Sequence, residues 1–395
     1  MNIAAVRAQM PALKSYTWFQ NGGVSITPQP IADVHAGLMR ELLERGPMHI
    51  VYPDEEYPRR RATTARLARF FGVDAGEIAV VRGVSEGYQT LLRGMQWKEG
   101  DEVLITEEEE GSVLIPSLHL RERHGVKVVK LPLIDDHERL MAAFRERLSE
   151  RTRLIAMSMV TTDIGFMLPV KEMCAIARDR NIATFFDLAH AAGLLPIDLV
   201  DLGVDYAGIL SYKWMYSPYA AGLFYVRRER LHDLQVTYAG GRGEKFIDFE
   251  KDEFELHDTA ERFQHGPWSW PLVHTWAFAC DWLESFGLAE IRARTLGLTG
   301  RLKAGLEQIP GITQYSSPTA ERSAALVAFS LEGWTGEQMT AVLREEKRMI
   351  VKPQPAPKIG LRISLPFFIE ETEIDALLAA VAELATRKPP TQESA

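Results

Sequence analysis

Two short stretches decide how this chain folds: Phe185-Phe186-Asp187-Leu188-Ala189-His190 and, after a crossover, Gly208-Ile209-Leu210-Ser211-Tyr212-Lys213-Trp214. Each begins with an apolar run typical of a buried strand and ends in a side chain that can ionise. The first supplies a carboxylate and then an imidazole, and the second supplies an amine. A carboxylate can keep a pyridine nitrogen protonated, and an amine can form a Schiff base with an aldehyde. Together these groups predict a site for pyridoxal 5′-phosphate (PLP).

Seven apolar, β-rich runs alternate with helix-like segments between about residues 55 and 270, one of these helices being expected over 170–181. The runs cover residues 78–81, 102–105, 126–129, 154–157, 183–186, 206–210 and 222–226. Such alternation indicates an α/β fold with a mostly parallel seven-stranded sheet covered on both faces. In such sheets ligands bind at the carboxyl ends of the strands. The polar residues at or just past those ends, which we expect to share one site, are Ser85, Glu110, Thr162, Asp187 and Lys213.

The remaining segments predict the domain organisation. Residues 1–30, interrupted by glycines and prolines, are expected to form an N-terminal arm. Residues 31–270 would form the large α/β domain, and residues 271–387 a small α+β domain. In the small domain we expect helices over 276–298, 335–347 and 371–385, with apolar runs over 324–331 and 361–364. The polar residues 388–395 are expected to be a disordered tail.

Composition narrows the class of protein. The 395 residues are 46% hydrophobic and 25% charged, which suits a two-domain enzyme. A net charge of −9 argues against a nucleic-acid partner. No run reaches the roughly 20 apolar residues of a membrane span, and the first residues lack the build of a signal peptide. Two cysteines and scattered histidines predict no disulfide framework and no metal site, so we expect a cytoplasmic protein.

The individual site residues also have simpler interpretations. Gly83-Val84-Ser85 follows a strand-like run and opens a helix, where free amides and a hydroxyl suit a phosphate. The same serine could be a plain helix cap, Asp187 could form a structural ion pair, and His190 could be structural. Lys213, between two aromatic residues, is expected to be desolvated, which lowers the pKa of its amine and frees the amine for attack.

With these residues on hand, the chain resembles a fold-type I PLP enzyme of the class V aminotransferase family, nearest to the isopenicillin N epimerase-like branch. The resemblance extends over nearly the whole chain. It includes the arm 19–25, the turn 83–87, the Asp187 and His190 pair, the stretch 211–214 and the stretch 361–364. It implies the fold of PLP-dependent transferases of fold type I and a homodimer with shared active sites.

The resemblance also implies a role for each site residue. Lys213 would form the Schiff base and move the proton at the substrate α-carbon, and Asp187 would keep the ring nitrogen protonated. Arg362 would pair with the α-carboxylate of an amino acid substrate, and Asn21 would line the substrate side. The other cofactor-binding residues would be Gly83, Val84, Ser85 and Tyr212 at the phosphate and Thr162 and His190 at the phenolic oxygen.

Three positions depart from the pattern of the family. Glu110 stands where relatives carry an aromatic residue or histidine that stacks on the cofactor ring. Its carboxylate could serve as an additional acid or base, although a charge run such as 107–110 is usually a solvated face. Pro267 stands where relatives have a threonine that reaches the phosphate of the neighbouring subunit. No cysteine lies in the loop before Arg362, which argues against a cysteine desulfurase.

Several reactions are compatible with these residues. Transamination is the default prediction. A β- or γ-elimination lyase or an epimerase is the alternative, because all of these reactions begin with loss of the α-proton. A cofactor-free structural or regulatory relative is an alternative of another class, against which the intact Lys213, Asp187 and Arg362 argue. A nucleotide-dependent α/β enzyme would need a glycine fingerprint that the sequence lacks.

Overall fold

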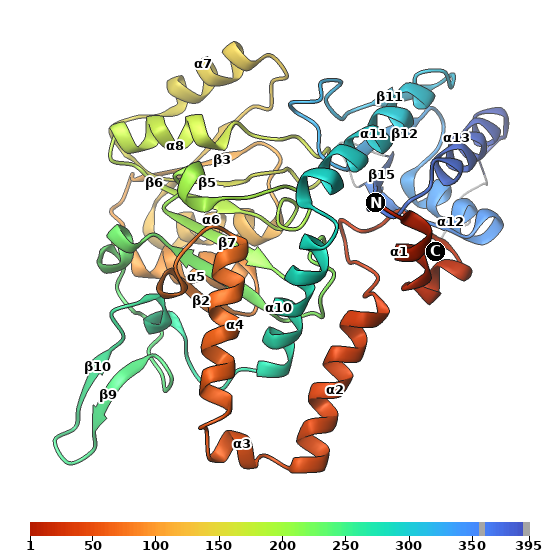
Figure 1. The fold of residues 1–395 in the computed structure, drawn as a ribbon. Coiled ribbons are helices and arrows are strands. Elements are labelled where there is room, and N and C mark those ends of the chain that lie inside the picture. The colour runs from red at the N-terminus through yellow and green to blue at the C-terminus, as the bar shows by residue number, and fades with distance from the viewer. Residues whose placement is uncertain (355–359, 390–395) are drawn as a thin grey trace.

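A seven-stranded sheet forms the centre of the computed structural model, which describes residues 1–354 and 360–389 (Figure 1). The strand order is β2-β8-β7-β6-β5-β3-β4. These strands are β2 (Ile78–Val81), β3 (Glu102–Thr106), β4 (Lys127–Leu131), β5 (Thr152–Ser158), β6 (Ala183–Asp187), β7 (Tyr206–Leu210) and β8 (Gly222–Val226). The five neighbouring strands β7, β6, β5, β3 and β4 pair in parallel. Strand β8 is antiparallel to both β7 and β2. The predicted mostly parallel seven-stranded sheet is confirmed.

Helices cover both faces of this sheet, which explains why its strands are almost continuously apolar. Neighbouring residues of one strand enter different hydrophobic clusters: Phe185 packs with residues of α5 and α6, and Phe186 packs with residues of α7 and α8. The helices around the sheet are α5 (Val84–Gly94), α6 (Gly111–His124), α7 (His137–Arg147), α8 (Val170–Asp179) and α9 (Leu199–Leu202).

A second, four-stranded antiparallel sheet lies in the C-terminal part of the chain, in the order β11-β12-β15-β14. Its elements are β11 (Ile312–Gln314), β12 (Leu326–Leu331), β14 (Lys352–Gln354), β15 (Gly360–Ser364), α11 (Leu288–Leu306), α12 (Gly336–Lys347) and α13 (Glu371–Thr386). The single helix predicted over 276–298 is wrong. Two helices, α10 (Trp270–Glu284) and α11, are separated at Gly287, whose φ of 79° lies in the left-handed region that favours glycine.

The N-terminal arm connects the small sheet to the loop that carries Lys213. Its elements are α1 (Ile3–Ala8), the 3₁₀ turn at Pro11–Lys14 and β1 (Thr17–Trp18), which pairs with β13 (Met349–Ile350). Gln20 bridges to Ser364 of β15, and the Ser25 amide donates a hydrogen bond to the Tyr212 carbonyl at 2.9 Å. The arm therefore lies against both halves of the site described below. Of the predicted tail, residues 390–395 lie outside the described residues.

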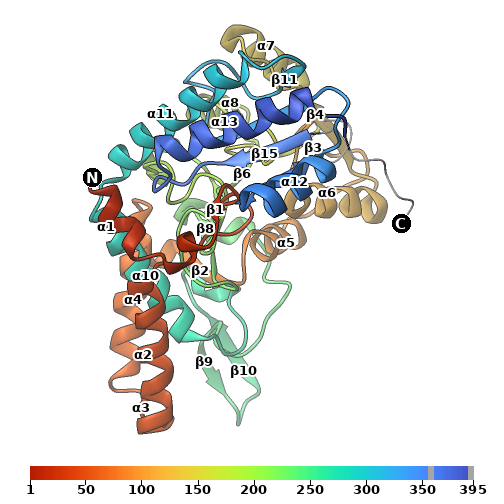
Figure 2. The same cartoon turned by 90° about the vertical axis from the view of Figure 1, so that its right-hand side faces the viewer.

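Two segments project from the body of the molecule (Figure 2). One contains α2 (Gln29–Arg45), α3 (Met48–Val51) and α4 (Glu56–Phe70), and the other is the hairpin of β9 (Glu244–Asp248) and β10 (Glu253–Leu256). The remaining 3₁₀ turns are Ala75–Glu77, Arg228–Asp233 and Ala260–Phe263. Among the helices within residues 1–354 and 360–389, none is long and apolar enough to cross a membrane.

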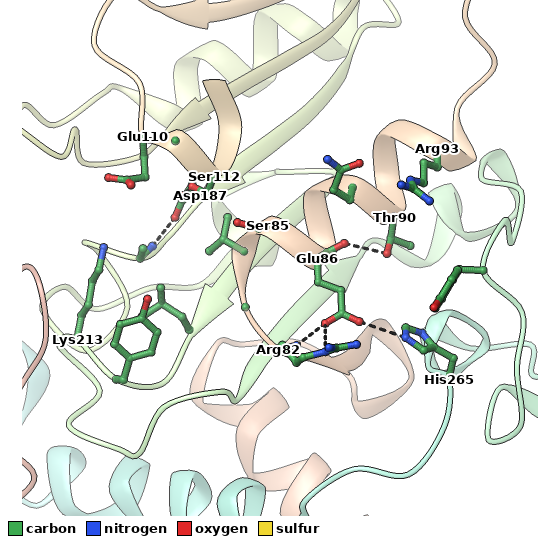
Figure 3. Close-up of a pocket in the computed structure, with 18 of the residues that line it drawn as sticks. Arg82, Ser85, Glu86, Thr90, Arg93, Glu110, Ser112, Asp187, Lys213 and His265 are labelled. Carbon is green, nitrogen blue, oxygen red and sulfur yellow. Dashed lines mark hydrogen bonds and ion pairs between the residues drawn. The ribbon is translucent and has the colours of Figure 1, made fainter. Parts of the chain in front are cut away.

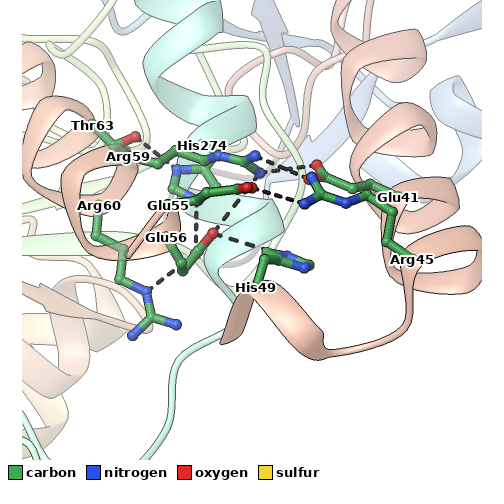
Figure 4. A network of polar contacts seen from close by, with 9 residues as sticks. All are labelled: Glu41, Arg45, His49, Glu55, Glu56, Arg59, Arg60, Thr63 and His274. Atoms are coloured by element: carbon green, nitrogen blue, oxygen red, sulfur yellow. Dashed lines mark hydrogen bonds and ion pairs between the residues drawn. The ribbon is translucent and has the colours of Figure 1, made fainter. Parts of the chain in front are cut away.

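A buried polar network fixes the first projection to the body (Figure 4). The Glu56 carboxylate on α4, only 3% exposed, lies 3.2 Å from the His274 Nε2 of α10 and 3.1 Å from the Arg60 Nε. The Thr63 hydroxyl lies 2.7 Å from the other imidazole nitrogen of His274. Contacts between α4 and α10 thus combine apolar packing with a buried carboxylate–imidazole pair.

Candidate active site

The carboxyl ends of the central strands open into a cavity of about 740 Å³ (Figure 3). Its walls come from α5, the start of α6, and the segments after β6 and β7. The predicted site residues that line it are Gly83, Val84, Ser85, Glu110, Asp187, Tyr212 and Lys213. Four others, Asn21, Thr162, His190 and Arg362, lie beside the cavity and are linked to Lys213 through hydrogen bonds. Residues far apart in sequence are thus assembled at one sheet edge.

Lys213 follows β7 and is 8% exposed. Burial lowers the pKa of its amine; the carboxylates of Asp187 and Glu110 act in the opposite direction without reversing the shift. The Nζ atom lies 3.3 Å from the His190 Nε2. A buried lysine with a lowered pKa has a larger fraction of the neutral, nucleophilic amine near neutral pH.

The hydrogen bonds of His190 define its protonation. The Trp214 indole N–H, which can only donate, points to the His190 Nδ1 at 3.3 Å. Burial and the positive charge of Lys213 hold the imidazole pKa well below its ordinary value. The ring is therefore neutral, with its proton on Nε2. That N–H faces the Lys213 amine at 3.3 Å and the Thr162 hydroxyl at 3.2 Å.

Asp187 is the last residue of β6 and is 2% exposed. Its two carboxylate oxygens accept hydrogen bonds from the Ser112 hydroxyl and the Ala189 amide, each at 2.8 Å. Burial raises the pKa of this carboxyl group despite the nearby Lys213. A buried carboxylate is costly without a cation, so a protonated ring nitrogen would be a suitable partner. Ser112 was not among the predicted residues, and its only sequence signal is its place in the first turn of the helix after Glu110.

The first turn of α5 is suited to a phosphate. The amides of Val84 and Ser85 have no carbonyl one turn earlier in the helix, and the helix dipole adds positive potential there. A Cβ atom on Gly222 would lie 2.5 Å from the Gly83 Cα, so only glycine allows β8 to approach this turn so closely. A Cβ on Gly83 would meet no atom within 4 Å, which leaves the turn open toward a ligand.

Glu110 and Arg362 place opposite charges near Lys213. Burial raises the pKa of Glu110, but the charge of Lys213 and a hydrogen bond with Thr162 outweigh it, so the net shift is downward and the carboxylate is ionised. Arg362 is 1% exposed, and burial lowers its guanidinium pKa to about 10. Its Nη1 donates to the Thr162 carbonyl at 2.8 Å and its Nη2 to the Gln20 side chain at 3.2 Å. Both acceptors are neutral.

Three further positions singled out from the sequence have different relations to the cavity. The amide of Asn21, which is fully buried, donates to the Lys213 carbonyl at 3.4 Å and thus supports the backbone of the lysine. The Tyr212 ring lines the cavity and stacks on Tyr219 with centroids 4.6 Å apart. Pro267 lies in a separate hollow between α4 and the segment that follows β10. The predicted contacts of Asn21 with the substrate and of Tyr212 with the phosphate stay predictions, and so does the doubt about a phosphate contact at Pro267, which lacks a hydroxyl and an amide hydrogen.

The residues present fit PLP. A phosphate-binding helix start, an acidic group for the ring nitrogen and a buried amine for the aldehyde converge on one cavity, which is the donor set that this cofactor requires. The fourth element is a guanidinium for the carboxylate of a substrate. It belongs to Arg362, which is connected to the site through a hydrogen bond with Thr162. Within residues 1–354 and 360–389, no cluster of three or more metal-ligating side chains occurs.

Comparison with known proteins also indicates a PLP-dependent enzyme. The family described as Aminotransferase class-V matches residues 55–377, which is most of the chain. The chain belongs to the class V aminotransferase family. The resemblance inferred from the sequence is therefore confirmed, and with it an enzyme of PLP-dependent fold type I.

Individual relatives of this class V enzyme carry other names. Isopenicillin N epimerase of Streptomyces clavuligerus is 29% identical over 335 residues, covering 80% of this chain and 82% of the epimerase. A probable cysteine desulfurase of Methanothermobacter thermautotrophicus is 23% identical over 359 residues, covering 89% and 87% of the two chains. Among solved structures, the cystine C-S lyase C-DES in complex with cysteine persulfide superposes with a TM-score of 0.86 at 26% identity, covering 96% of this chain and all of the lyase. A C-DES variant with glycine covalently linked to the PLP cofactor gives 0.87 at 25% identity, covering 95% and 99%.

Proposed function

We propose that this enzyme uses PLP to remove the α-proton of an amino acid and completes a β- or γ-elimination. The observation that carries this proposal is the buried Lys213 amine, which faces neutral His190 and lies in one cavity with the Asp187 carboxylate. Transamination, the default from the sequence, finds no support among the relatives, which are named for desulfuration, C-S cleavage or epimerisation.

Each of the main site residues has a defined task in this proposal. PLP, when bound, would supply an electron sink for the electrons left at the α-carbon. Asp187, fixed by Ser112, would keep the ring nitrogen protonated, and the first turn of α5 would hold the phosphate. Arg362 would orient the substrate through its α-carboxylate. The Lys213 amine would accept the α-proton, and burial favours this because it lowers the amine pKa.

Cysteine desulfuration does not suit this chain, although several relatives are named for it. A desulfurase needs an accessible thiol to receive sulfur, and both cysteines, Cys174 and Cys280, are buried. Burial raises the pKa of the Cys174 thiol to about 12 and raises that of Cys280 as well. Neither thiol is therefore a reactive thiolate near neutral pH. This agrees with the missing cysteine before Arg362.

Epimerisation is the second candidate, and Glu110 is the observation that favours it. Epimerisation needs a second group that can exchange a proton with the α-carbon. The ionised Glu110 carboxylate immediately precedes α6, lies on the same side of Asp187 as the Lys213 amine in Figure 3 and lines the same cavity. In an elimination, the same carboxyl group could instead assist departure of the leaving group.

The reaction can be assigned by incubating the PLP-loaded enzyme with a panel of L- and D-amino acids and measuring keto acid, epimer and ammonia. The proposal predicts ammonia with keto acid, or the epimer, in the absence of an amino-group acceptor.

Glu110→Gln should slow the reaction at least ~100-fold and alter its pH profile, because general acid–base catalysis contributes a factor of about 10²–10⁴ to the rate. The matched control, Glu107→Gln, changes an exposed carboxylate of the same run and should leave the rate unaltered. Amino-group transfer that requires an added keto acid would refute the proposal, and an unchanged Glu110→Gln enzyme would remove Glu110 from the chemistry.

We also propose that the enzyme is a homodimer, as the resemblance implies. Large apolar side chains are exposed on both projections: Met39, Leu43, Met48, Ile50, Val51 and Tyr52 around α2 and α3, and Phe246, Ile247, Phe249 and Phe254 on the β9–β10 hairpin. Clusters of this kind usually mark an interface, and a second copy of the chain is the occupant that the resemblance supplies. The cytoplasmic location expected from the sequence stays a prediction.

A further inference from the structure

Lys352 on β14 lies directly opposite Arg362 on β15. Residues paired in this way on adjacent antiparallel strands point to the same face, and like charges at such a pair destabilise the sheet. The two cations are only partly accessible: Arg362 is 1% exposed and Lys352 is half-buried. Two largely inaccessible cations on one strand pair do not stabilise the sheet, so their presence needs another explanation.

The position of Lys352 is fixed relative to the active site. Two residues after it, the Gln354 side chain donates to the Asp163 carbonyl at 2.8 Å, and Asp163 follows Thr162, whose carbonyl accepts from Arg362. The ammonium charge acts on Lys213, His190 and Glu110. Lys352 thus belongs electrostatically to the site, although no pattern around it in the sequence marks it as a site residue.

Charge around Lys352 is incompletely balanced. The ammonium forms no ion pair with residues 1–354 or 360–389. Burial and the charge of Arg362 lower its pKa, and the carboxylates of Asp163 and Glu110 oppose this shift without reversing it. The Glu110 carboxylate lines the cavity, but its interaction with Lys213 is stronger than that with Lys352. One substrate α-carboxylate would neutralise Arg362 and leave Lys352 without a directly ion-paired anion among residues 1–354 and 360–389.

We propose that Lys352 binds a second anionic group of the substrate, so that the enzyme prefers amino acids whose side chain ends in a carboxylate or a comparable anion. The inference rests on the proposed function, in which Arg362 takes the α-carboxylate. Lys352 is then a specificity-determining residue, and the Lys352–Arg362 spacing across two strands selects substrates with two negative groups.

Unreactive acids test this inference without turnover. The PLP-loaded enzyme is titrated with glutarate, which has two carboxylates, and with butyrate, which has one, while the visible band of the bound cofactor is followed. In the wild type, glutarate should bind at least about tenfold more tightly than butyrate. In Lys352→Gln this ratio should fall to below about threefold, with the dissociation constant for butyrate changed by less than about twofold.

The control and the contradicting results separate this inference from the proposed function. Lys347→Gln removes the same charge from α12, where Lys347 pairs with Glu383 at 2.7 Å, and should keep the preference for glutarate. Equal binding of both acids by the wild type would overturn the inference. Equal weakening of both acids in Lys352→Gln would also overturn it, because Lys352 would then share the α-carboxylate with Arg362. A protein without a visible cofactor band would instead contradict the proposed function itself.

Discussion

At the scale of single residues, neighbouring carboxyl groups of the site have pKa values shifted in opposite directions, upward by burial at Glu109 and downward by Lys213 and Thr162 at Glu110. Glu109 illustrates this next to Glu110. Its carboxylate accepts hydrogen bonds from the Ser158 amide at 3.0 Å, from the Ser158 hydroxyl and from the Thr106 hydroxyl at 2.9 Å. Burial nevertheless raises its pKa to about 7, and the charge of nearby Asp187 adds to the shift. Ser158 is the residue paired with Asp187 across β5 and β6. Through Ser158, Glu109 is thus connected to the strand pair that carries Asp187, the residue that would hold the ring nitrogen.

Glu109 predicts a specific pH dependence of stability. Between its ordinary pKa of 4.5 and the folded-state value of about 7, the folded protein keeps this proton and the unfolded chain releases it. The contribution of Glu109 to the free energy of unfolding therefore falls as the pH rises through this window, by a few kcal/mol at most, since one pKa unit corresponds to about 1.4 kcal/mol. Urea unfolding of the apo-protein at pH 5 and pH 8 should show a smaller loss of stability in Glu109→Gln than in the wild type. Identical losses of stability in the two proteins would refute the raised pKa of Glu109.

The four glutamates 107–110 show what the sequence could not reveal about the site. A charge run is normally solvated, and Glu107 is indeed exposed. Glu108, however, accepts from the Asp163 and Ile164 amides, Glu109 binds Ser158, and Glu110 faces Lys213. The partners of these carboxylates lie about 50 to 100 residues further along the chain, so no local pattern could distinguish them. Asp187 and Lys213 were easier to identify, because Asp187 ends one apolar run of the sequence and Lys213 closely follows another.

At the scale of helices and strands, the large sheet could be predicted from the sequence because its strands are apolar on both faces. The division of the helix predicted over 276–298 into α10 and α11 could not be predicted. The break at Gly287 was hidden, because apolar residues continue on both sides of it, at Leu283, Phe286 and Leu288. The packing of the two resulting helices differs: α10 contacts α2 and α4, while α11 contacts α13. The predicted division at residue 270 therefore remains a proposal, with α10 packed against elements of the large domain.

The α4–α10 contact yields a prediction about stability. Glu56→Ala removes a carboxylate that is 3% exposed and leaves His274 and Arg60 without their partner. The free energy of unfolding should fall by roughly 2–4 kcal/mol, because removal of one member of a buried polar pair leaves the other uncompensated. Glu55→Ala, which removes an exposed carboxylate paired with Arg45, should cost less than about 1 kcal/mol. Chemical denaturation of both variants checks this, and equal losses would contradict a structural role for the network.

At the scale of the whole molecule, the shape agrees with an assembly of two copies. The projection formed by α2, α3 and α4 and the β9–β10 hairpin extend away from the body (Figures 1 and 2). Both carry exposed apolar side chains. The sequence indicated a homodimer only through resemblance, because an exposed leucine or phenylalanine has the same local pattern as a buried one. Only the folded chain shows which apolar residues are left uncovered.

The assembly prediction can be tested by light scattering coupled to size exclusion. The wild type should have twice the mass of one chain. Leu43→Glu places a charge on a side chain that is 83% exposed in the single chain, and it should shift the protein to the monomer if that surface is covered by a second copy. Val200→Glu, at an apolar residue that is 61% exposed and lies outside both projections, is the matched control and should leave the mass unchanged. A monomeric wild type, or equal behaviour of both variants, would argue against this interface.

The central claim is that Lys213 is the amine that binds PLP, and it can be tested by locating the covalent link. The PLP-loaded enzyme is reduced with borohydride, digested and sequenced by mass spectrometry. Two other lysines, the buried Lys303 and the half-buried Lys352, also have lowered amine pKa values, about 8 in the case of Lys303, so the experiment has genuine competitors. The structure predicts a pyridoxyl group on Lys213 and its loss, together with the visible cofactor band, in Lys213→Ala. A pyridoxyl group on another lysine, or none on any, would contradict the account.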